Sequence, residues 1–261
     1  MREKYRIGMI GHGYIGRSLY QSFAGSEVQI ASVYDHRTAN IADLPQSIAT
    51  ADADAFIDTL AGLDLVVEVA HPDVTAKIGA RVLGKTNYMP CSVVALADEE
   101  LRQQLLAVAR QADTRLYIPH GAVVGMDELI EARSGWKSAT ITFRKPPALL
   151  DAAGHPQADG AVLFEGSARE IAKRFPRSVN AMVACALATV GLDVTTTRMV
   201  ADSRFGNVLR GEFEFVAENG ARLTIIKEEP GVGVSGVGMM HSIKGSVMRV
   251  LRVKVDNPIF V

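Results

Sequence analysis

A glycine triplet near the start of the chain has the spacing of a phosphate-binding turn. Gly11, Gly13 and Gly16 follow the apolar segment 5–10 and open a segment with helical spacing. In that setting the first glycine permits a tight turn, the second lets the backbone approach a pyrophosphate, and the third lets helix pack on strand. Backbone amides at the start of a helix attract phosphate groups. We therefore predict a dinucleotide site formed by Gly11, Gly13, Tyr14, Ile15 and Gly16.

An acidic residue at the end of the next predicted strand bears on the choice of cofactor. Asp35 lies about 20 residues beyond the glycines, where a carboxylate accepts hydrogen bonds from an adenosine ribose. The same carboxylate repels a 2′-phosphate, which favours NAD. His36 and Arg37 follow directly, and a cation there can accommodate the 2′-phosphate of NADP. The expected cofactor is NAD or NADP, with NAD preferred.

Two histidines, His71 and His120, follow predicted strands. The carboxyl ends of parallel strands are where open α/β sheets bind their ligands. Because the ordinary pKa of histidine is about 6.5, both side chains are candidates for proton transfer. Ala70, directly before His71, is expected to line the nicotinamide part of the cleft. His12, inside the glycine turn, is expected to cover the cofactor.

A lysine near the middle of the chain is a candidate for binding carboxylate groups. Lys145 ends a predicted strand and is followed by two prolines that fix the backbone. Arg144 alternates to the other face of that strand. The sequence shows no carboxylate pair at hydrolase spacing, no cluster of metal ligands and no G-x-S-x-G segment. No metal site is therefore predicted.

The composition is that of an ordinary globular protein. The chain has 261 residues, of which 48% are hydrophobic and 22% charged, and its formal net charge is -1. The lack of a basic excess argues against a nucleic-acid partner. Cys91 and Cys185 are the only cysteines, which fits a reducing cytoplasm. Because the chain has no run of about 18 apolar residues, no membrane-spanning segment or membrane partner is predicted.

The first half of the chain alternates short apolar strands with helical segments, which is typical of a parallel sheet. Strands are expected at 5–10, 28–34, 64–70, 88–94 and 115–119, and helices at 15–24, 73–83 and 98–112. From about residue 121 the pattern predicts helices at 126–133, 167–175 and 180–190, strands at 138–144 and 195–200, a hairpin over 212–227 and a last helix from 239. Asn219-Gly220 is expected to form a type I′ turn in the hairpin. Helix 180–190 is so uniformly apolar that it should be buried, with a subunit interface as one place for it.

These elements predict an α/β protein of two domains. Residues 1–120 should form a Rossmann domain with a doubly wound parallel sheet, and residues 121–240 a smaller α+β domain for catalysis and dimerisation. The segment 240–261 is expected to return to the first domain.

Four further segments resemble one family. Segment 117–127 (YIPHGAVVGMD) is similar to the P-S-G-A-[IV]-x-G-[LM]-D segment of the L-aspartate dehydrogenases, which are small NAD(P)-dependent amino acid dehydrogenases. Segments 144–147 (RKPP), 163–170 (LFEGSARE) and 175–181 (FPRSVNA) resemble their R-K-P-P, L-F-x-G-S-A-R-E and F-P-x-N-x-N-V segments. With the glycine turn, the resemblance runs from about residue 5 to about residue 202.

The resemblance implies a reaction and a set of partners. The reaction is the reversible oxidative deamination of L-aspartate to oxaloacetate and ammonia through iminosuccinate, with hydride passing to the nicotinamide, usually in a homodimer. The substrate is therefore expected to be a small amino or oxo acid. Ala122 and Asn180 match family residues that contact the cofactor.

The chain also departs from the family pattern. Leu209 stands where the N-x-H-x-[IV] pattern has a catalytic histidine, and Pro230 to Gly238 replaces an N-P-K-T-S segment. His120 stands in place of a serine, so it is a candidate to take over the work of the missing histidine. Two alternatives stay open: a dehydrogenase or imine reductase of the same class with another substrate, and a dinucleotide-binding sensor without turnover.

Overall fold

The computed structural model describes residues 4–121, 123, 125–152, 154, 158–232, 235–236 and 238–253. The chain forms two compact units. The first unit comprises Met1–Ser92, Glu100–Pro119 and Met240–Val261, and the second comprises Val93–Glu99 and His120–Met239. Within the described residues, no helix has the length and apolar character needed to cross a membrane.

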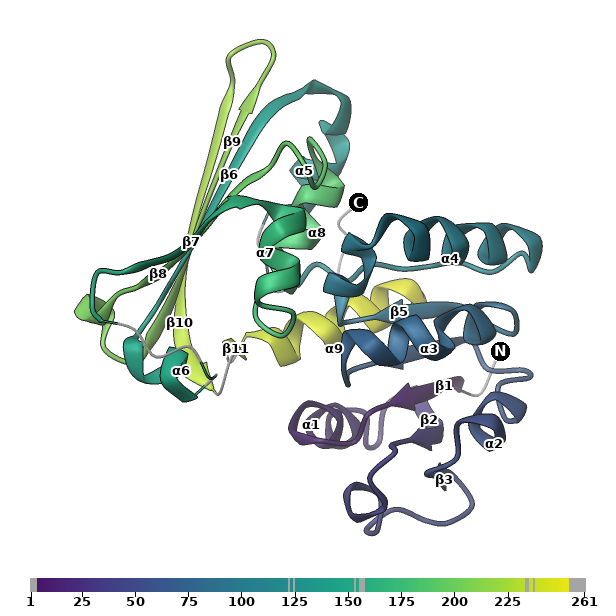
Figure 1. Cartoon of the computed structure of the whole chain (residues 1–261). Helices are drawn as coiled ribbons and strands as arrows, with labels where there is room; N and C mark the ends of the chain where they lie inside the picture. Colours follow the sequence, from purple (N-terminus) through teal and green to yellow (C-terminus); the bar gives the residue numbers. More distant parts are fainter. Residues whose placement is uncertain are drawn as a thin grey trace. The chain divides into compact units, whose positions relative to one another are not determined.

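The first unit is built on a five-stranded parallel sheet (Figure 1). Its strands are β1 (Tyr5–Ile10), β2 (Val28–Tyr34), β3 (Ala49–Thr50), β4 (Leu65–Glu68) and β5 (Tyr88–Pro90), in the order β3-β2-β1-β4-β5. Its helices are α1 (Tyr14–Ser22), α2 (Ala53–Asp58), α3 (Pro72–Leu83), α4 (Glu99–Gln111) and α9 (Met239–Val250), with the 3-10 turn η1 (Thr38–Asn40). The strands are short and apolar because both faces of the sheet are covered, and Met9 and Val67 are fully buried. The predicted doubly wound parallel sheet is confirmed.

Two expected strands end differently from the prediction. Strand 88–94 stops at Pro90, and the chain continues as the 3-10 helix η2 (Val93–Ala97). The reason is that the backbone N–H of Ser92 donates to the Glu68 carboxylate, at 3.0 Å, and not to a neighbouring strand. Segment 115–119 makes only an isolated parallel bridge, between Tyr88 and Leu116.

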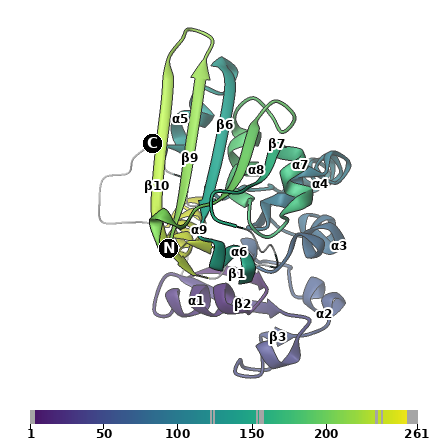
Figure 2. The same cartoon turned by 60° about the vertical axis from the view of Figure 1, so that its left-hand side comes forward.

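The second unit is built on a six-stranded mixed sheet. Its strands are β6 (Trp136–Lys145), β7 (Val162–Ser167), β8 (Thr196–Ala201), β9 (Val208–Ala217), β10 (Arg222–Val232) and β11 (Ser235–Gly236), in the order β11-β10-β9-β6-β8-β7. Strands β6 and β8 are parallel, and the other neighbours are antiparallel. Figure 2 shows the long strands β6, β9 and β10 side by side. The remaining elements are α5 (Met126–Glu131), α6 (Pro147–Ala152), α7 (Ala168–Arg174), α8 (Asn180–Ala188), η3 (Arg133–Gly135) and η4 (Ser203–Phe205).

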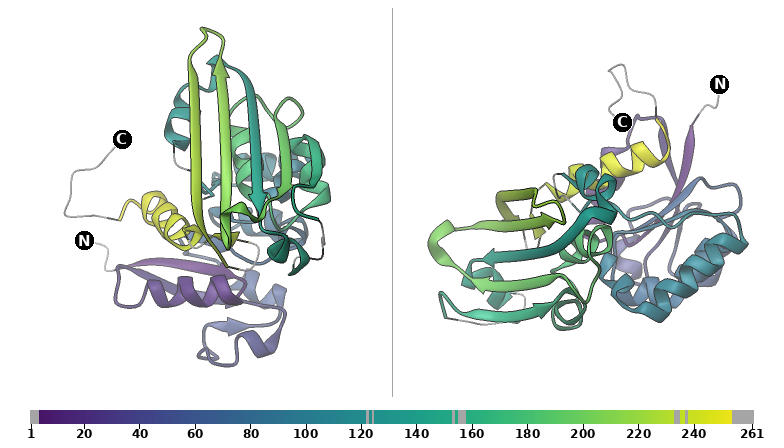
Figure 3. Two further views of the ribbon diagram at one scale, coloured as in Figure 1. Left: turned by 90° about the vertical axis from the view of Figure 1, so that its left-hand side faces the viewer. Right: turned by 90° about the horizontal axis from the view of Figure 1, so that it is seen from above.

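Helices α5, α7 and α8 lie on one face of this sheet (Figures 1 and 3). The apolar helix α8 is buried as expected, because it contacts α5, α7 and η2 within the same unit. The Cys185 thiol lies 3.8 Å from the Met126 sulfur. No subunit interface is needed to explain the composition of α8.

The hairpin of β9 and β10 is confirmed, but its predicted turn type is wrong. A type I′ turn requires positive φ at both central residues, and of the pair only Gly220 has it, at 86°. The Gly220 N–H donates to the Ala217 carbonyl at 3.0 Å, and the Asn219 side chain accepts from the Ala221 N–H at 2.9 Å. The loop is therefore one residue longer than a two-residue turn, with the glycine as its left-handed residue.

Helix α7 begins with a capping box, which gives a stability prediction. The Ser167 hydroxyl accepts from the Glu170 N–H at 3.2 Å, and the Glu170 carboxylate accepts from the Ser167 N–H at 2.9 Å. Replacing Ser167 by Ala should lower the free energy of unfolding of the second unit by about 1 kcal/mol. Urea unfolding followed by the fluorescence of Trp136, the only tryptophan, measures the change.

The matched control is Ser134→Ala, at an exposed position in η3 of the same unit. We expect its urea midpoint to equal that of the unaltered chain. Equal midpoints for the two variants would contradict a stabilising role of the capping box.

Candidate active site

The glycine turn after β1 has the close approaches that its sequence predicts. A Cβ on Gly16 would lie 2.2 Å from the Gly11 carbonyl oxygen, and one on Gly11 would lie 2.9 Å from the Ala70 Cβ. At Gly13, by contrast, nothing lies within 4 Å of such an atom. Gly13 caps α1 without a side-chain hydrogen bond, so no capping side chain takes up the first amides of α1. This cradle fits the pyrophosphate of a dinucleotide.

Asp35, at the end of β2, is tied to the same turn. Its carboxylate accepts from the His12 N–H at 2.8 Å, from the Arg37 N–H at 2.9 Å and from the Asn40 amide at 2.9 Å. Burial alone would raise the pKa of Asp35, but these three hydrogen bonds and nearby His36 hold it below its ordinary value. Asp35 therefore stays ionised near neutral pH, as ribose binding requires.

His12 does not cover an open site as expected. The residue is 1% exposed, and its Nδ1 atom lies 2.6 Å from the Asn40 carbonyl oxygen. Its ring edge also contacts Tyr20, with 5.7 Å between centroids. The His12 side chain thus packs inside the first unit and connects the glycine turn to the segment around Asn40. The exposed residue of the turn is Tyr14, at 71%.

His71 is held as the N-cap of α3. Its Nδ1 atom accepts from the Asp73 N–H at 3.3 Å and lies 3.4 Å from the Asp73 carboxylate. Its side chain is 38% exposed. A structural role for His71 is therefore visible, and its role in proton transfer stays a prediction.

Two other expected site residues, His120 and Ala122, lie at the start of the His120–Met239 segment of the second unit. The His120 Nε2 atom lies 3.9 Å from the Asp127 carboxylate, and the His120 side chain is 26% exposed. Ala122 lies outside the described residues. Its neighbours Gly121 and Val123 line a pocket of the second unit.

This pocket, of about 120 Å³, lies over the ends of β6, β9 and β10. The strand pairing sets Phe143 opposite Gly211 and Arg144 opposite Arg210. One step further along both strands, Lys145 comes opposite Leu209. Strand β10 pairs with the other edge of β9, with Lys227 opposite Gly211 and Glu229 opposite Leu209.

Lys145 and Leu209 therefore share one face of the sheet with Lys227 and Glu229. All four line the pocket. Gly211 carries no side chain because the Phe213 ring packs against it: a Cβ there would lie 2.8 Å from that ring.

Lys145 is the most deeply buried charged group of the pocket. The residue is 6% exposed, and burial lowers the pKa of its amine to about 8. Lys227 instead pairs with Glu229 at 2.7 Å. Arg177, which precedes α8, is exposed at the pocket.

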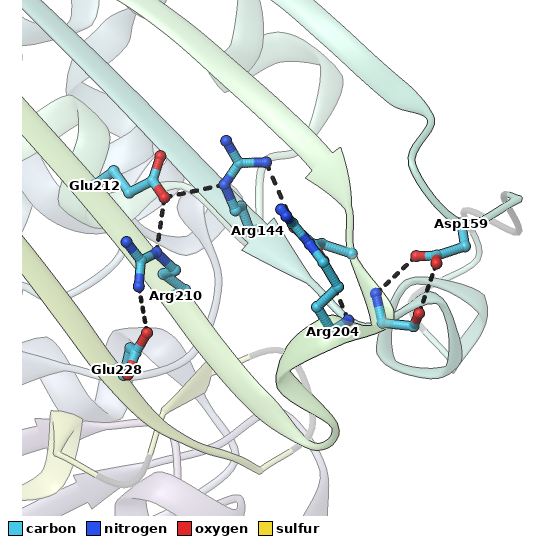
Figure 4. Close-up of polar contacts among 8 residues, drawn as sticks. Arg144, Asp159, Arg204, Arg210, Glu212 and Glu228 are labelled. Carbon is cyan, nitrogen blue, oxygen red and sulfur yellow. Dashed lines mark hydrogen bonds and ion pairs between the residues drawn. The ribbon is translucent and has the colours of Figure 1, made fainter.

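Arg144 belongs to a separate charge network (Figure 4). Its guanidinium lies 3.0 Å from the Glu212 carboxylate, which also binds Arg210 at 2.7 Å. Arg144 also lies 3.5 Å from Asp202, a carboxylate whose pKa is lowered to about 2, chiefly by the hydrogen bond from Arg204. Strand alternation turns the Arg144 and Arg210 side chains away from that of Lys145, although both residues also line the edge of the pocket.

Asn180, expected to contact the cofactor, is the first residue of α8 and lines the pocket. Its side-chain oxygen accepts from the Val94 N–H at 3.0 Å. Arg169 of α7 pairs with Asp193 at 2.6 Å and lies 3.5 Å from Glu99. Both side chains thus fasten the Val93–Glu99 segment within the second unit.

Sequence reasoning missed most residues of the pocket, among them the four that matter most for its charge and shape. They are Arg177, Gly211, Lys227 and Glu229. The hairpin was predicted, and with the correct loop length its register would have placed Lys227 opposite Gly211. Arg177 stands inside the F-P-x-N-x-N-like segment, three residues before Asn180.

Comparisons with known proteins agree with this geometry. The family model "Aspartate dehydrogenase, C-terminal" matches residues 128–230, and "Homoserine dehydrogenase, NAD binding domain" matches residues 11–119. An L-aspartate dehydrogenase from Methanosarcina acetivorans is 35% identical, over 80% of this chain and 84% of the relative. L-aspartate dehydrogenase 2 from Bordetella bronchiseptica is also 35% identical, over 77% of this chain and 79% of the relative.

A solved structure is similar over the whole fold. The aspartate dehydrogenase from Thermotoga maritima is 25% identical, with a TM-score of 0.77, over 98% of this chain and 99% of that chain. The match of residues 11–119 of this chain to an NAD-binding domain supports a nicotinamide dinucleotide as its cofactor. The chain belongs to the L-aspartate dehydrogenase family, a family of NAD(P)-dependent oxidoreductases.

Proposed function

We propose that the chain interconverts L-aspartate with oxaloacetate and ammonia through iminosuccinate, using NAD or NADP. The names of its relatives support the reaction. The observation that carries the proposal is the pocket of the second unit, where Lys145, Lys227 and Arg177 gather positive charge. Such a pocket suits a substrate with two carboxylates.

Arg177 and Lys227 are the groups that bind these carboxylates. A guanidinium can hold a carboxylate through two parallel hydrogen bonds. The Lys227 ammonium is held by an ion pair with Glu229. Its remaining N–H groups can donate hydrogen bonds to the substrate.

The first unit holds the cofactor through the glycine turn and Asp35. When bound, the nicotinamide accepts the hydride from the substrate α-carbon, or returns it in the reductive direction. Asn180, and Ala122 by family resemblance, are proposed to contact the same cofactor.

Lys145 is the group that moves protons during imine hydrolysis. With a pKa of about 8, about a tenth of its amines are neutral at pH 7. As water adds to the imine carbon, a C–O bond forms, the C=N electron pair moves to nitrogen, and neutral Lys145 accepts the water proton. The lysine then returns this proton to the nitrogen, which gives the carbinolamine. The carbinolamine hydroxyl proton next passes to the nitrogen through the same amine, the C–N bond breaks, the C=O bond forms and ammonia leaves.

This assignment differs from the expectation based on sequence, which gave proton transfer to His120 and carboxylate binding to Lys145. Burial favours Lys145, because a buried amine is neutral more often than an exposed one. His120 remains the second candidate, and His71 the third.

The direct test is oxidation of NADH and NADPH by the purified protein with oxaloacetate plus ammonia, beside a panel of other oxo acids and amines. We expect turnover with oxaloacetate. Turnover only with another oxo acid would mean that a related dehydrogenase acts on another substrate. Tight dinucleotide binding with no turnover across the panel would mean that the protein is a sensor.

The role of Lys145 is tested by Lys145→Arg, which keeps the positive charge but cannot release a proton near neutral pH. In the unaltered enzyme, kcat for aspartate oxidation should rise with pH through about 8, because the neutral amine is the active form. In the variant we expect kcat to fall by about a hundredfold and this rise to disappear, with the KM for aspartate changed by less than about threefold.

The control is His120→Ala, for which we expect kcat within about tenfold of the unaltered enzyme, or roughly 1.4 kcal/mol of barrier. The reverse result, with His120→Ala inactive and Lys145→Arg active, would restore the assignment made from sequence. Unchanged dinucleotide affinity shows that each variant is folded.

Asp35 sets the cofactor preference. Its carboxylate is ionised near neutral pH and repels a 2′-phosphate, so kcat/KM should be higher with NAD than with NADP. Asp35→Ser should lower the NAD-to-NADP ratio of kcat/KM by about tenfold, because it removes this repulsion. A preference for NADP in the unaltered enzyme would overturn the role of Asp35.

We also propose a homodimer located in the cytoplasm. The homodimer is supported by family resemblance. Both cysteines, Cys91 and Cys185, carry free thiols, which suits a reducing compartment.

A further inference from the structure

Glu68 is the last residue of β4, beside β1, where the strand order of the parallel sheet reverses direction. It pairs with Ile10, the last residue of β1, directly before the glycine turn. Strand order runs from β1 through β2 to β3 on one side and through β4 to β5 on the other. A dinucleotide binds at such a switch point, outside the carboxyl ends of the strands.

The surroundings of Glu68 fit a carboxylate and not a carboxylic acid. Its Oε1 atom accepts from the Ala70 N–H at 2.6 Å and the Ser92 hydroxyl at 2.9 Å, and its Oε2 atom accepts from the Ser92 N–H at 3.0 Å. The Thr75 hydroxyl adds a donor to Oε2 at 3.4 Å and lies 2.9 Å from the Tyr88 hydroxyl, which can donate to it. Each carboxylate oxygen thus faces one amide and one hydroxyl. A proton on either oxygen would displace one of these donors.

This buried charge has no ion-pair partner among the residues that the structure describes. Glu68 is fully buried, and the contacts described above are all hydrogen bonds from neutral groups. Burial raises the pKa of the Glu68 carboxyl, while its hydrogen bonds oppose the shift. Its charge adds to the effect of burial in raising the pKa of Tyr88 and Cys91, so these neighbours stay neutral. A buried charge without a counter-ion is costly, so a positively charged group of a bound ligand would stabilise the ionised form of Glu68.

We infer that the Glu68 carboxylate is the counter-charge of the oxidised nicotinamide ring, and that it makes the site discriminate NAD⁺ from NADH. The oxidised ring is positively charged and the reduced ring is neutral. An anion fixed beneath the switch point therefore stabilises the oxidised form relative to the reduced form. Bound NADH becomes a stronger hydride donor as a consequence. This discrimination depends on dinucleotide binding alone, so it stands whether or not L-aspartate is the substrate.

The test compares the dissociation constants of NAD⁺ and NADH, measured by titration calorimetry, in the unaltered protein and in Glu68→Gln. We expect the ratio Kd(NADH)/Kd(NAD⁺) to fall by about fivefold in the variant. If Glu68 only held the Ala70 and Ser92 backbones in place, both affinities would weaken together and the ratio would not change. The control is Thr75→Val, which removes one donor but keeps the charge, and for which the ratio should be unchanged.

A second measurement uses the unaltered protein and does not depend on the variant folding. Benzamide adenine dinucleotide has the shape of NAD⁺ but an uncharged ring. We expect the protein to bind NAD⁺ about fivefold more tightly than this analogue. Equal affinities for the two ligands would overturn the inference. No turnover is measured in either experiment, so a failure of the proposed reaction leaves both results interpretable.

Discussion

The register between β6 and β9 decides which charged side chains face the pocket. Because side chains alternate along a strand, a shift by one residue would exchange the faces on which the Lys145 and Arg144 side chains lie. In the actual register Lys145 and Leu209 each lie one step beyond the Arg144–Arg210 pair, and Lys145 lies on the buried face. On the other face, Arg144 and Arg210 share the Glu212 carboxylate, an arrangement that only this register permits. The buried lysine and the charge network are thus two consequences of one strand pairing.

The first unit places two anions at different parts of its cofactor site. Asp35 follows β2 and is tied by the His12 N–H to the glycine turn, so its charge bears on the adenosine ribose. Glu68 ends β4 and is held by the loops after β4 and β5. In our proposals, the first anion selects between NAD and NADP, and the second selects between the two oxidation states of the same cofactor. Both carboxylates accept hydrogen bonds from backbone amides, which favour the ionised form and oppose the effect of burial.

Local patterns in the sequence predicted the features that depend on neighbouring residues. The glycine turn, Asp35 and the alternation of strands and helices each lie within a short stretch, so their spacing was informative. The environment of Lys145 was not predictable, because it depends on Leu209, 64 residues further along the chain. The role of Glu68 was missed for the same reason: within a run of apolar residues it resembled part of a buried strand, and its partner Ser92 follows a different strand. The Asn219 turn was misjudged because its side chain, and not its backbone conformation, supports the loop.

The most direct measurement of the central claim follows the hydrogen on the α-carbon. L-Aspartate labelled with deuterium at that carbon is incubated with the protein and the oxidised cofactor, and the reduced cofactor is examined by NMR. The account predicts one deuterium on the nicotinamide ring for each oxaloacetate formed, because hydride passes directly between the two carbons. Unlabelled reduced cofactor, or no reduced cofactor with L-aspartate under conditions where the dinucleotide binds, would contradict it.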